Sequence, residues 1–270
     1  LSIEGPIRFG VTGVGRDIFG EAESTYGINE VMAVAHAVAM RVPSAKTVID
    51  MGGEFTKWIQ LDEEANVADF ATNGLCAAGA GAFLEQQAGR LMLSVQELGD
   101  LAGVASKGAT IAGRCSVFAK SDMIHLQQKG TPVDEIAYGL CLALIRTFSA
   151  TVLQGRTMQT PVALAGGGAA NKGLVRAVQE IFALDDSQLM IAPEPMTACA
   201  LGAALLASAE LPGVESIHDL IVDQRELDAQ RRTVKLSPLS PQQLPNKEGV
   251  ERPSLATLPK RAWLGMDVGS

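Results

Sequence analysis

The sequence alternates short apolar segments rich in β-branched residues with helical patterns, and a long helical stretch interrupts this alternation. Five segments have the length and composition of strands, at residues 7–11, 46–50, 56–61, 160–165 and 188–192. Helical spacing of apolar residues covers 29–42, 82–93, 94–103, 116–129, 132–154, 172–182 and 197–209. This order predicts an α/β fold, a sheet covered by helices, with a helical lobe at about residues 72–158 inserted between strands.

A change in composition near residue 210 marks the expected end of this folded domain, residues 1–210. Six of the twelve prolines follow it, and residues 211–260 have the polar, proline-rich composition of a linker. Residues 261–270 form an apolar segment that ends in Asp-Val-Gly-Ser. We interpret that segment as the first strand of a following domain.

Composition and charge exclude several classes of function. Hydrophobic residues make up 47% of the 270 residues and charged residues 19%, without an obvious apolar run of membrane-spanning length, which predicts a soluble protein with no membrane partner. The net charge is −8 and the basic residues form no cluster, so nucleic-acid binding is disfavoured. Four cysteines without a disulfide-scaffold pattern favour a reducing, cytoplasmic location.

Three glycine turns follow expected strands. They are Asp50-Met-Gly52-Gly53, Gly166-Gly167-Gly168 and Asp267-Val-Gly269-Ser270. Glycine lets backbone N–H groups approach phosphate oxygens, and an aspartate at a strand end can hold Mg²⁺ or its water shell. No G-x-x-x-x-G-K-[ST] segment is present, so the chain is not a P-loop protein. Each turn alone is more often a tight connection, and only their combination points to a nucleotide site.

Two of the four cysteines lie in glycine- and alanine-rich segments that open or precede helical patterns. These segments are Cys76-Ala-Ala-Gly-Ala-Gly-Ala-Phe83 and Gly113-Arg-Cys115-Ser-Val-Phe118. A cysteine at a helix N-terminus favours the thiolate, which binds soft metals and iron–sulfur clusters. A cubane cluster takes four cysteines, so this pair predicts a cluster shared between two copies of the domain, unless both are simply small buried residues. Cys141 and Cys199 lie in apolar helical contexts that favour core packing.

The order of these motifs resembles the actin-like ATPase superfamily, in which two sheet halves clamp ATP between hairpins. Four segments, beginning at Val48, Cys76, Arg114 and Gly166, resemble more closely the BadF/BadG/BcrA/BcrD family over roughly residues 7–209. That family comprises activators of 2-hydroxyacyl-CoA dehydratases and ATPase subunits of benzoyl-CoA reductases. The resemblance implies an α/β, actin-like (ribonuclease H-like) ATPase fold. It is partial here because the first phosphate-loop hairpin is missing.

The resemblance also implies a set of site residues. Cys76 and Cys115 fall on the positions that hold one [4Fe-4S] cluster between two subunits. Asp50 belongs to the catalytic site, unless it is only a cap at the strand end. Glu54 stands where the family usually has glutamine and could orient the attacking water. The implied contacts of ATP with Mg²⁺ are Gly52, Gly53, Gly166, Gly167, Gly168, Asn171, Asp267, Gly269 and Ser270. Lys57 is interpreted as a solvated charge on a strand.

The implied activity is ATP-driven transfer of a low-potential electron to a 2-hydroxyacyl-CoA dehydratase or related CoA-thioester reductase. We expect the chain to be part of a longer tandem activase, with a second ATPase domain or subunit as a further partner. One alternative is a docking or regulatory module that keeps the fold but hydrolyses nothing. Two features favour it: Phe55, where the family usually has aspartate, and the missing first phosphate loop. A more remote alternative is a sugar or acyl kinase of the same superfamily, which leaves the cysteines unexplained.

Overall fold

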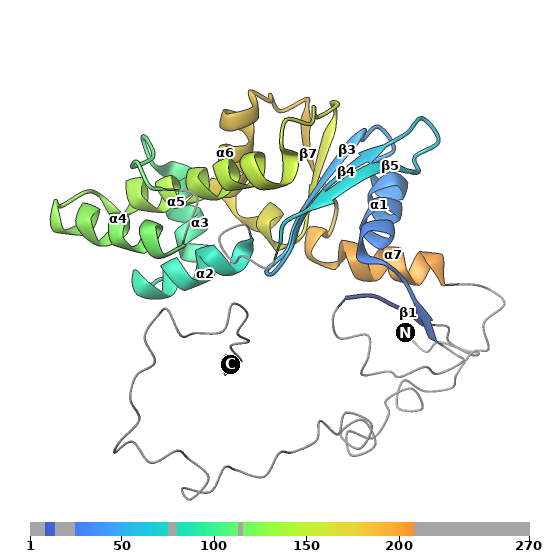
Figure 1. Cartoon of the computed structure of the whole chain (residues 1–270), viewed down its shortest axis with the longest axis horizontal. Helices are drawn as coiled ribbons and strands as arrows, with labels where there is room; N and C mark the ends of the chain where they lie inside the picture. The colour runs from blue at the N-terminus through green and yellow to red at the C-terminus, as the bar shows by residue number, and fades with distance from the viewer. Residues whose placement is uncertain (1–8, 14–24, 75–79, 113–115, 208–270) are drawn as a thin grey trace, which may run out of the picture. The chain divides into compact units, whose positions relative to one another are not determined.

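The computed structural model describes residues 9–13, 25–74, 80–112 and 116–207 (Figure 1). The chain divides into two units, Leu1–Leu227 and Asp228–Ser270, and every described residue belongs to the first. The linker expected at 211–260 and the strand expected at 261–270 lie outside the described residues, so both stay predictions.

A five-stranded mixed sheet forms the centre of the first unit (Figure 1). Its strands, in the order β5-β4-β3-β6-β7, are β5 (Val67–Thr72), β4 (Thr56–Leu61), β3 (Thr47–Met51), β6 (Val162–Ala165) and β7 (Leu189–Ile191). The pairs β3–β4 and β4–β5 are antiparallel, whereas β3–β6 and β6–β7 are parallel. All residues of β3 and β6 are buried, as expected for central strands covered on both faces. A short parallel pair, β1 (Phe9–Val11) and β2 (Thr25–Gly27), forms a second sheet.

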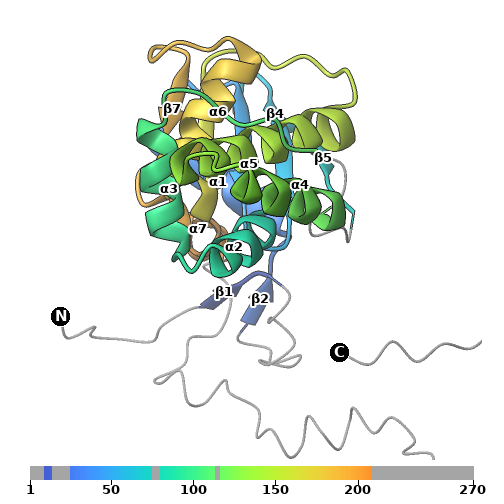
Figure 2. The same cartoon turned by 90° about the vertical axis from the view of Figure 1, so that its left-hand side faces the viewer.

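The helices lie on both sides of the five-stranded sheet (Figures 1 and 2). On one side are α1 (Glu30–Arg41) and α7 (Ala198–Leu206). On the other are the lobe and α6 (Lys172–Phe182); the lobe consists of α2 (Gly81–Arg90), α3 (Val95–Val104), α4 (Ser116–Gln128), α5 (Val133–Phe148) and a π-helical turn at Ser149–Leu153. Two 3₁₀ turns, at Gly167–Ala170 and Pro195–Thr197, precede α6 and α7.

Side-chain alternation along β3 divides the core into two parts. Val48 packs with α1 and α7, while Ile49 and Met51 pack with the lobe and α6. Because successive side chains of a strand point to opposite faces, Asp50 lies on the same face as Val48. The position of Asp50 in the strand therefore directs its carboxylate towards α1 and α7.

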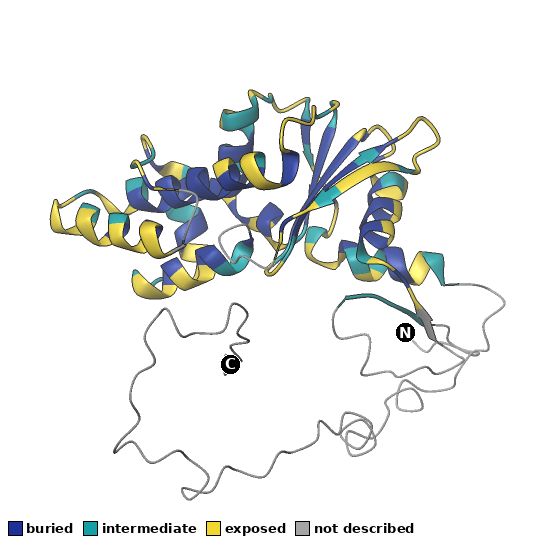
Figure 3. Cartoon of the chain, viewed as in Figure 1, coloured by how far each residue is buried: buried dark blue, intermediate teal, exposed yellow. Residues whose placement is uncertain are grey.

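The longest buried element is α5 with its π-helical extension, Val133–Leu153. Figure 3 shows buried residues concentrated in α5 and the sheet, whereas α4 is largely exposed. Among the described residues, Val133–Leu153 is the one helix long and apolar enough to cross a membrane, and 78% of its apolar window is buried inside the protein. The sequence-based expectation of no such run was therefore wrong. Because most of this apolar window is buried against the rest of the protein, Val133–Leu153 is the core helix of the lobe.

The predicted elements agree with the observed ones in order and type. Each strand and helix expected within the described residues has a counterpart, and the lobe is inserted between β5 and β6. The prediction missed β2 and β5. Most residues of β5 are exposed and it lies at the edge of the sheet, so it lacks the apolar alternation that marks a strand. Residues 132–154 were predicted as one α-helix, but the last turn widens to a π-helix.

Candidate functional site

A buried ion pair joins the ends of β3 and β4. Asp50 and Lys57 are direct cross-strand partners, so their side chains lie on the same face of the sheet. Lys57 Nζ donates to Asp50 Oδ2 at 2.8 Å and lies 3.1 Å from Glu30 Oε2, in the first turn of α1. Lys57 is 7% exposed, so its interpretation as a solvated charge was wrong. Helix α1 covers this face of the sheet, and its Glu30 supplies a second carboxylate to the Lys57 ammonium group.

Lys57 is held in its charged form by these two carboxylates. Burial by itself would lower the pKa of Lys57, but the charge of Asp50 and the hydrogen bonds to Asp50 and Glu30 outweigh that effect and raise it. Lys57 is therefore an ammonium ion at neutral pH. Its positive charge compensates the negative charge of Asp50, which is only 3% exposed.

Cys199 lies beside this ion pair, near the start of α7. Its Sγ is 3.9 Å from Asp50 Oδ2, and the side chain is partly buried. Burial, followed by the charge of Asp50, raises the pKa of the Cys199 thiol to about 12. Cys141 is fully buried in the core, as predicted from the sequence. Cys199 is partly buried and packs against the core on the α1 side of the sheet, but it also lies beside Asp50.

A pocket of about 360 Å³ opens above the ion pair. Its lining comes from the β3–β4 turn, the turn after β6, the start of α1 and the residues before and within α7: Glu30, Asp50, Gly52, Gly53, Glu54, Phe55, Lys57, Gly166, Gly167, Pro195, Met196 and Cys199. Six of the residues predicted from sequence therefore meet here, although more than a hundred residues separate the two turns along the chain. Sequence reasoning missed Glu30, Lys57 and Cys199 as members of the site.

The two glycine turns meet at Gly166. This residue has a φ of +78°, and a Cβ there would lie 2.5 Å from Asp50 Oδ1 and Met51 O. Only glycine allows this backbone to approach the carboxylate so closely. The Gly166 N–H donates to Pro195 O at 2.9 Å, which ties the turn to the segment before α7. Backbone from both turns thus lines a polar hollow with Asp50 at its base.

Gly168 and Asn171 were predicted beside the nucleotide but do not line this pocket. Gly168 packs against Met51, where a Cβ would lie 2.6 Å from the Met51 Cβ. Asn171 is buried, and its Oδ1 accepts from the Leu174 N–H at 3.0 Å, which caps α6. Their nucleotide roles stay predictions.

Five predicted ligands lie outside the described residues: Cys76, Cys115, Asp267, Gly269 and Ser270. Within the part of the chain that is described, no group of three or more His, Cys, Asp or Glu side chains could hold a metal ion. A metal in this pocket would therefore need ligands besides the described side chains, such as phosphate oxygens and water.

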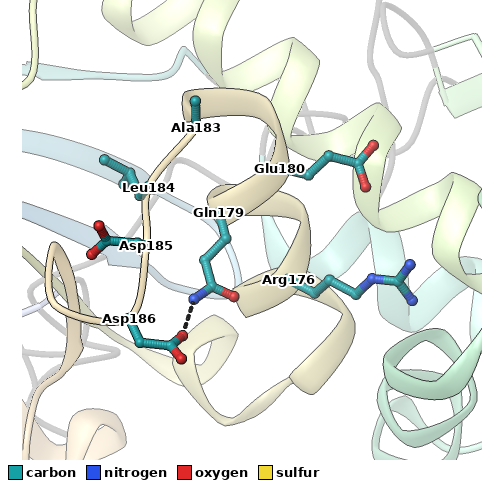
Figure 4. Close-up of a pocket in the computed structure, with 7 residues that line it drawn as sticks. All are labelled: Arg176, Gln179, Glu180, Ala183, Leu184, Asp185 and Asp186. Atoms are coloured by element: carbon teal, nitrogen blue, oxygen red, sulfur yellow. Dashed lines mark hydrogen bonds between the residues drawn. The ribbon is translucent and has the colours of Figure 1, made fainter.

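A second hollow lies along α6 and shares no residue with the pocket above the ion pair (Figure 4). Gln179 donates to Asp186 at 2.8 Å across it. Arg176, at its rim, donates to Ala105 O at 2.6 Å and lies over the Tyr138 ring at 4.0 Å from the centroid. The two Arg176 contacts join α6 to the end of α3 and to α5, which gives the hollow a structural explanation.

Comparisons with known proteins place the chain in a family. The profile of the BadF/BadG/BcrA/BcrD ATPase family matches residues 4–207. The activator of lactoyl-CoA dehydratase from Anaerotignum propionicum is 36% identical over 196 residues, which cover 73% of each chain. The 2-hydroxyisocaproyl-CoA dehydratase activator of Clostridioides difficile is 32% identical over 197 residues, 73% of this chain and 72% of that protein.

Two solved structures share the fold. The activator of 2-hydroxyisocaproyl-CoA dehydratase from Clostridium difficile, with bound ADPNP, gives a TM-score of 0.66 at 28% identity and covers 84% of this chain and 77% of that one. Component A of the (R)-2-hydroxyglutaryl-CoA dehydratase of Acidaminococcus fermentans also gives 0.66, at 30% identity and 73% coverage of each chain. The expected α/β ATPase fold is confirmed. The chain belongs to the BadF/BadG/BcrA/BcrD ATPase family.

Proposed function

We propose that this chain is an ATP-dependent activator of a 2-hydroxyacyl-CoA dehydratase or of a related CoA-thioester reductase. The observation that carries the proposal is the pocket in which two glycine turns meet over the buried Asp50–Lys57 pair. A relative with the same fold is described with bound ADPNP, and other relatives are named as activators of dehydratases. The chain would therefore bind ATP in this pocket.

The pocket suits a nucleotide phosphate group with its Mg²⁺. The backbone at Gly52, Gly53 and Gly166 lets phosphate oxygens approach without a side chain in the way. Asp50 faces the pocket and could hold the water shell of the metal, while Lys57 is already engaged by two carboxylates and so balances charge instead of binding phosphate. Bound Mg²⁺ would neutralise charge on the phosphates. Glu54 is exposed at the rim, where it could orient a water molecule.

Cys76 and Cys115 are proposed as ligands of a [4Fe-4S] cluster. This part of the proposal rests on the resemblance and on the donor set, because two thiolates per chain supply half of the four that such a cluster takes. The described elements that follow these cysteines in sequence are α2, which begins at Gly81, and α4, which begins at Ser116. A bound cluster would supply one-electron chemistry, and two copies of the domain would share it.

Nucleotide binding is the first test. Titration calorimetry of the chain with ATP and Mg²⁺ should give saturable binding, and Asp50→Asn should weaken it at least tenfold. Asp62→Asn, at the exposed β4–β5 turn, is the matched control and should bind as the wild type does. Absence of binding by the wild-type chain would refute the proposal.

Activation of a dehydratase is the second test. Under anaerobic conditions with a reductant, the reconstituted chain should start turnover of lactoyl-CoA dehydratase or 2-hydroxyisocaproyl-CoA dehydratase only when ATP is added. Iron and sulfide analysis should give about four irons for each pair of chains, lost in Cys76→Ala. Nucleotide binding without iron, ATP hydrolysis or activation would instead support the docking or regulatory module that Phe55 favours.

A further inference from the structure

The start of α2 is capped by the glycine turn of the pocket. The first N–H groups of a helix have no partner within the helix and are usually satisfied by a side chain at the N-cap. The N-cap here is Ala80, which offers no such side chain. Instead, the Gly81 N–H donates to Gly52 O at 2.9 Å and the Ala82 N–H to Gly53 O at 2.8 Å. The positive end of α2 thus rests on two peptide groups that line the pocket.

Gly81 makes this contact possible. A Cβ at residue 81 would lie 3.0 Å from Gly52 O and 3.4 Å from Gly53 Cα, so only a residue without a side chain fits without a shift. The contact is therefore a close backbone-to-backbone approach. Any displacement of the glycine turn changes the hydrogen bonds of the first turn of α2.

Asn73 makes a second connection to the same turn. Its Oδ1 accepts from the Thr56 N–H at 2.6 Å, and its Nδ2 donates to Glu54 O at 3.3 Å and to Gly74 O at 2.9 Å. The side chain is 6% exposed. Asn73 and Gly81 stand on either side of residues 75–79, which include Cys76 and lie outside the described residues. The chain is thus held to the glycine turn both before and after the first cysteine.

We infer that Asn73 and Gly81 are positioning residues that couple nucleotide binding at the glycine turn to the first turn of α2. The inference rests on the proposed function and adds the contacts through which the pocket acts on the lobe. The peptide group that carries Gly52 O has the N–H of Gly53, and the one that carries Gly53 O has the N–H of Glu54. A phosphate that accepts from either N–H polarises that peptide, which strengthens the hydrogen bond that its carbonyl accepts from the first turn of α2. By reciprocity, loss of these helix contacts weakens nucleotide binding by the same factor.

Hydrogen–deuterium exchange of the peptide that covers the start of α2 tests this inference in the cluster-free chain. ADP with Mg²⁺ should slow exchange of the Gly81 and Ala82 amides about fivefold or more. In Gly81→Ala the ratio of the exchange rates without and with nucleotide should fall below about twofold. Nucleotide affinity should fall by about the factor by which this ratio decreases. Gly89→Ala is the matched control on the same helix, because a Cβ there meets nothing within 4 Å. It should keep both the ratio and the affinity.

A second pair of variants separates coupling from loss of stability. Asn73→Ala should reduce the exchange ratio, whereas Asp62→Ala, which removes two side-chain hydrogen bonds at the other end of the β4–β5 hairpin, should not. Nucleotide binding to the wild-type chain without slower exchange at Gly81 and Ala82 would overturn this inference and leave the proposed function intact. If both Gly81→Ala and Asn73→Ala keep the full ratio of exchange rates without and with nucleotide, the inference is likewise overturned and the proposed function stands. Failure of the wild-type chain to bind nucleotide would overturn both.

Discussion

Replacement of Lys57 by methionine removes the cation from a buried site that holds two carboxylates. The ammonium lies 2.8 Å from Asp50 Oδ2 and 3.1 Å from Glu30 Oε2. At an effective dielectric constant of about 20, each contact is worth roughly 5–6 kcal/mol of gross attraction. The cost of burying the charges, several kcal/mol per ion, offsets much of that gain. In Lys57→Met the cost of burying Asp50 remains, so we expect a loss of about 3–5 kcal/mol in the free energy of unfolding.

A double-mutant cycle in urea measures this interaction directly. In Asp50→Asn the lysine keeps Glu30 as a partner, so the loss should be smaller, about 1–3 kcal/mol. The double variant contains no uncompensated Asp50 and should lose at least about 2 kcal/mol less than the sum of the two single variants. Additivity within about 0.5 kcal/mol would refute the reasoning, because it would mean that the two groups do not interact in the folded chain.

The pH dependence of the wild type follows from the raised pKa of Lys57. A raised folded-state pKa gives stability that is fully present below the unfolded value of about 10.5 and is lost as pH rises through the folded-state value. Titration of Lys57 should therefore leave unfolding free energy unchanged from pH 6 to 9. The difference between wild type and Lys57→Met, measured in urea, should narrow only above about pH 10.5.

Three further predictions concern single side chains. Gly166→Ala places a Cβ 2.5 Å from Asp50 Oδ1 at a φ of +78°, so it should weaken ATP binding, measured by calorimetry, more than about tenfold. Gly167→Ala is the control because a Cβ there meets nothing within 4 Å, and it should change ATP affinity less than about threefold. Alkylation of Cys199, followed by mass spectrometry, should rise about tenfold per pH unit from pH 7 to 10, because its pKa is about 12; a plateau near pH 9 would contradict that value. Tyr138→Phe removes the hydrogen bond that the phenol donates to Glu180 in α6, and it should lower the free energy of unfolding in urea by about 1–3 kcal/mol. An unchanged urea midpoint would show that this bond contributes nothing to stability.

Much of the fold could be predicted from the sequence because the signals are local. Apolar spacing located the main helices, and glycine turns after apolar strands located β3 and β6. The edge strand β5 was missed because most of its residues are exposed, so burial imposed no alternation on its sequence. Six of the predicted site residues line one pocket, because the ends of adjacent parallel strands meet at one edge of a sheet. Their roles in nucleotide binding stay predictions.

The sequence by itself determined the order of the elements, the residues that can form close turns and the family to which the chain belongs, because these depend on residue type and spacing. Only the tertiary structure decided the environment of Lys57, Cys199 and Asn73. A lysine four residues after a glycine turn is solvated or buried according to whether a helix covers that face, and here α1 brings Glu30 to it. Cys199 lies beside Asp50, 149 residues away in the chain, and Asn73 bonds across the β4–β5 hairpin to Thr56. No local pattern records such contacts.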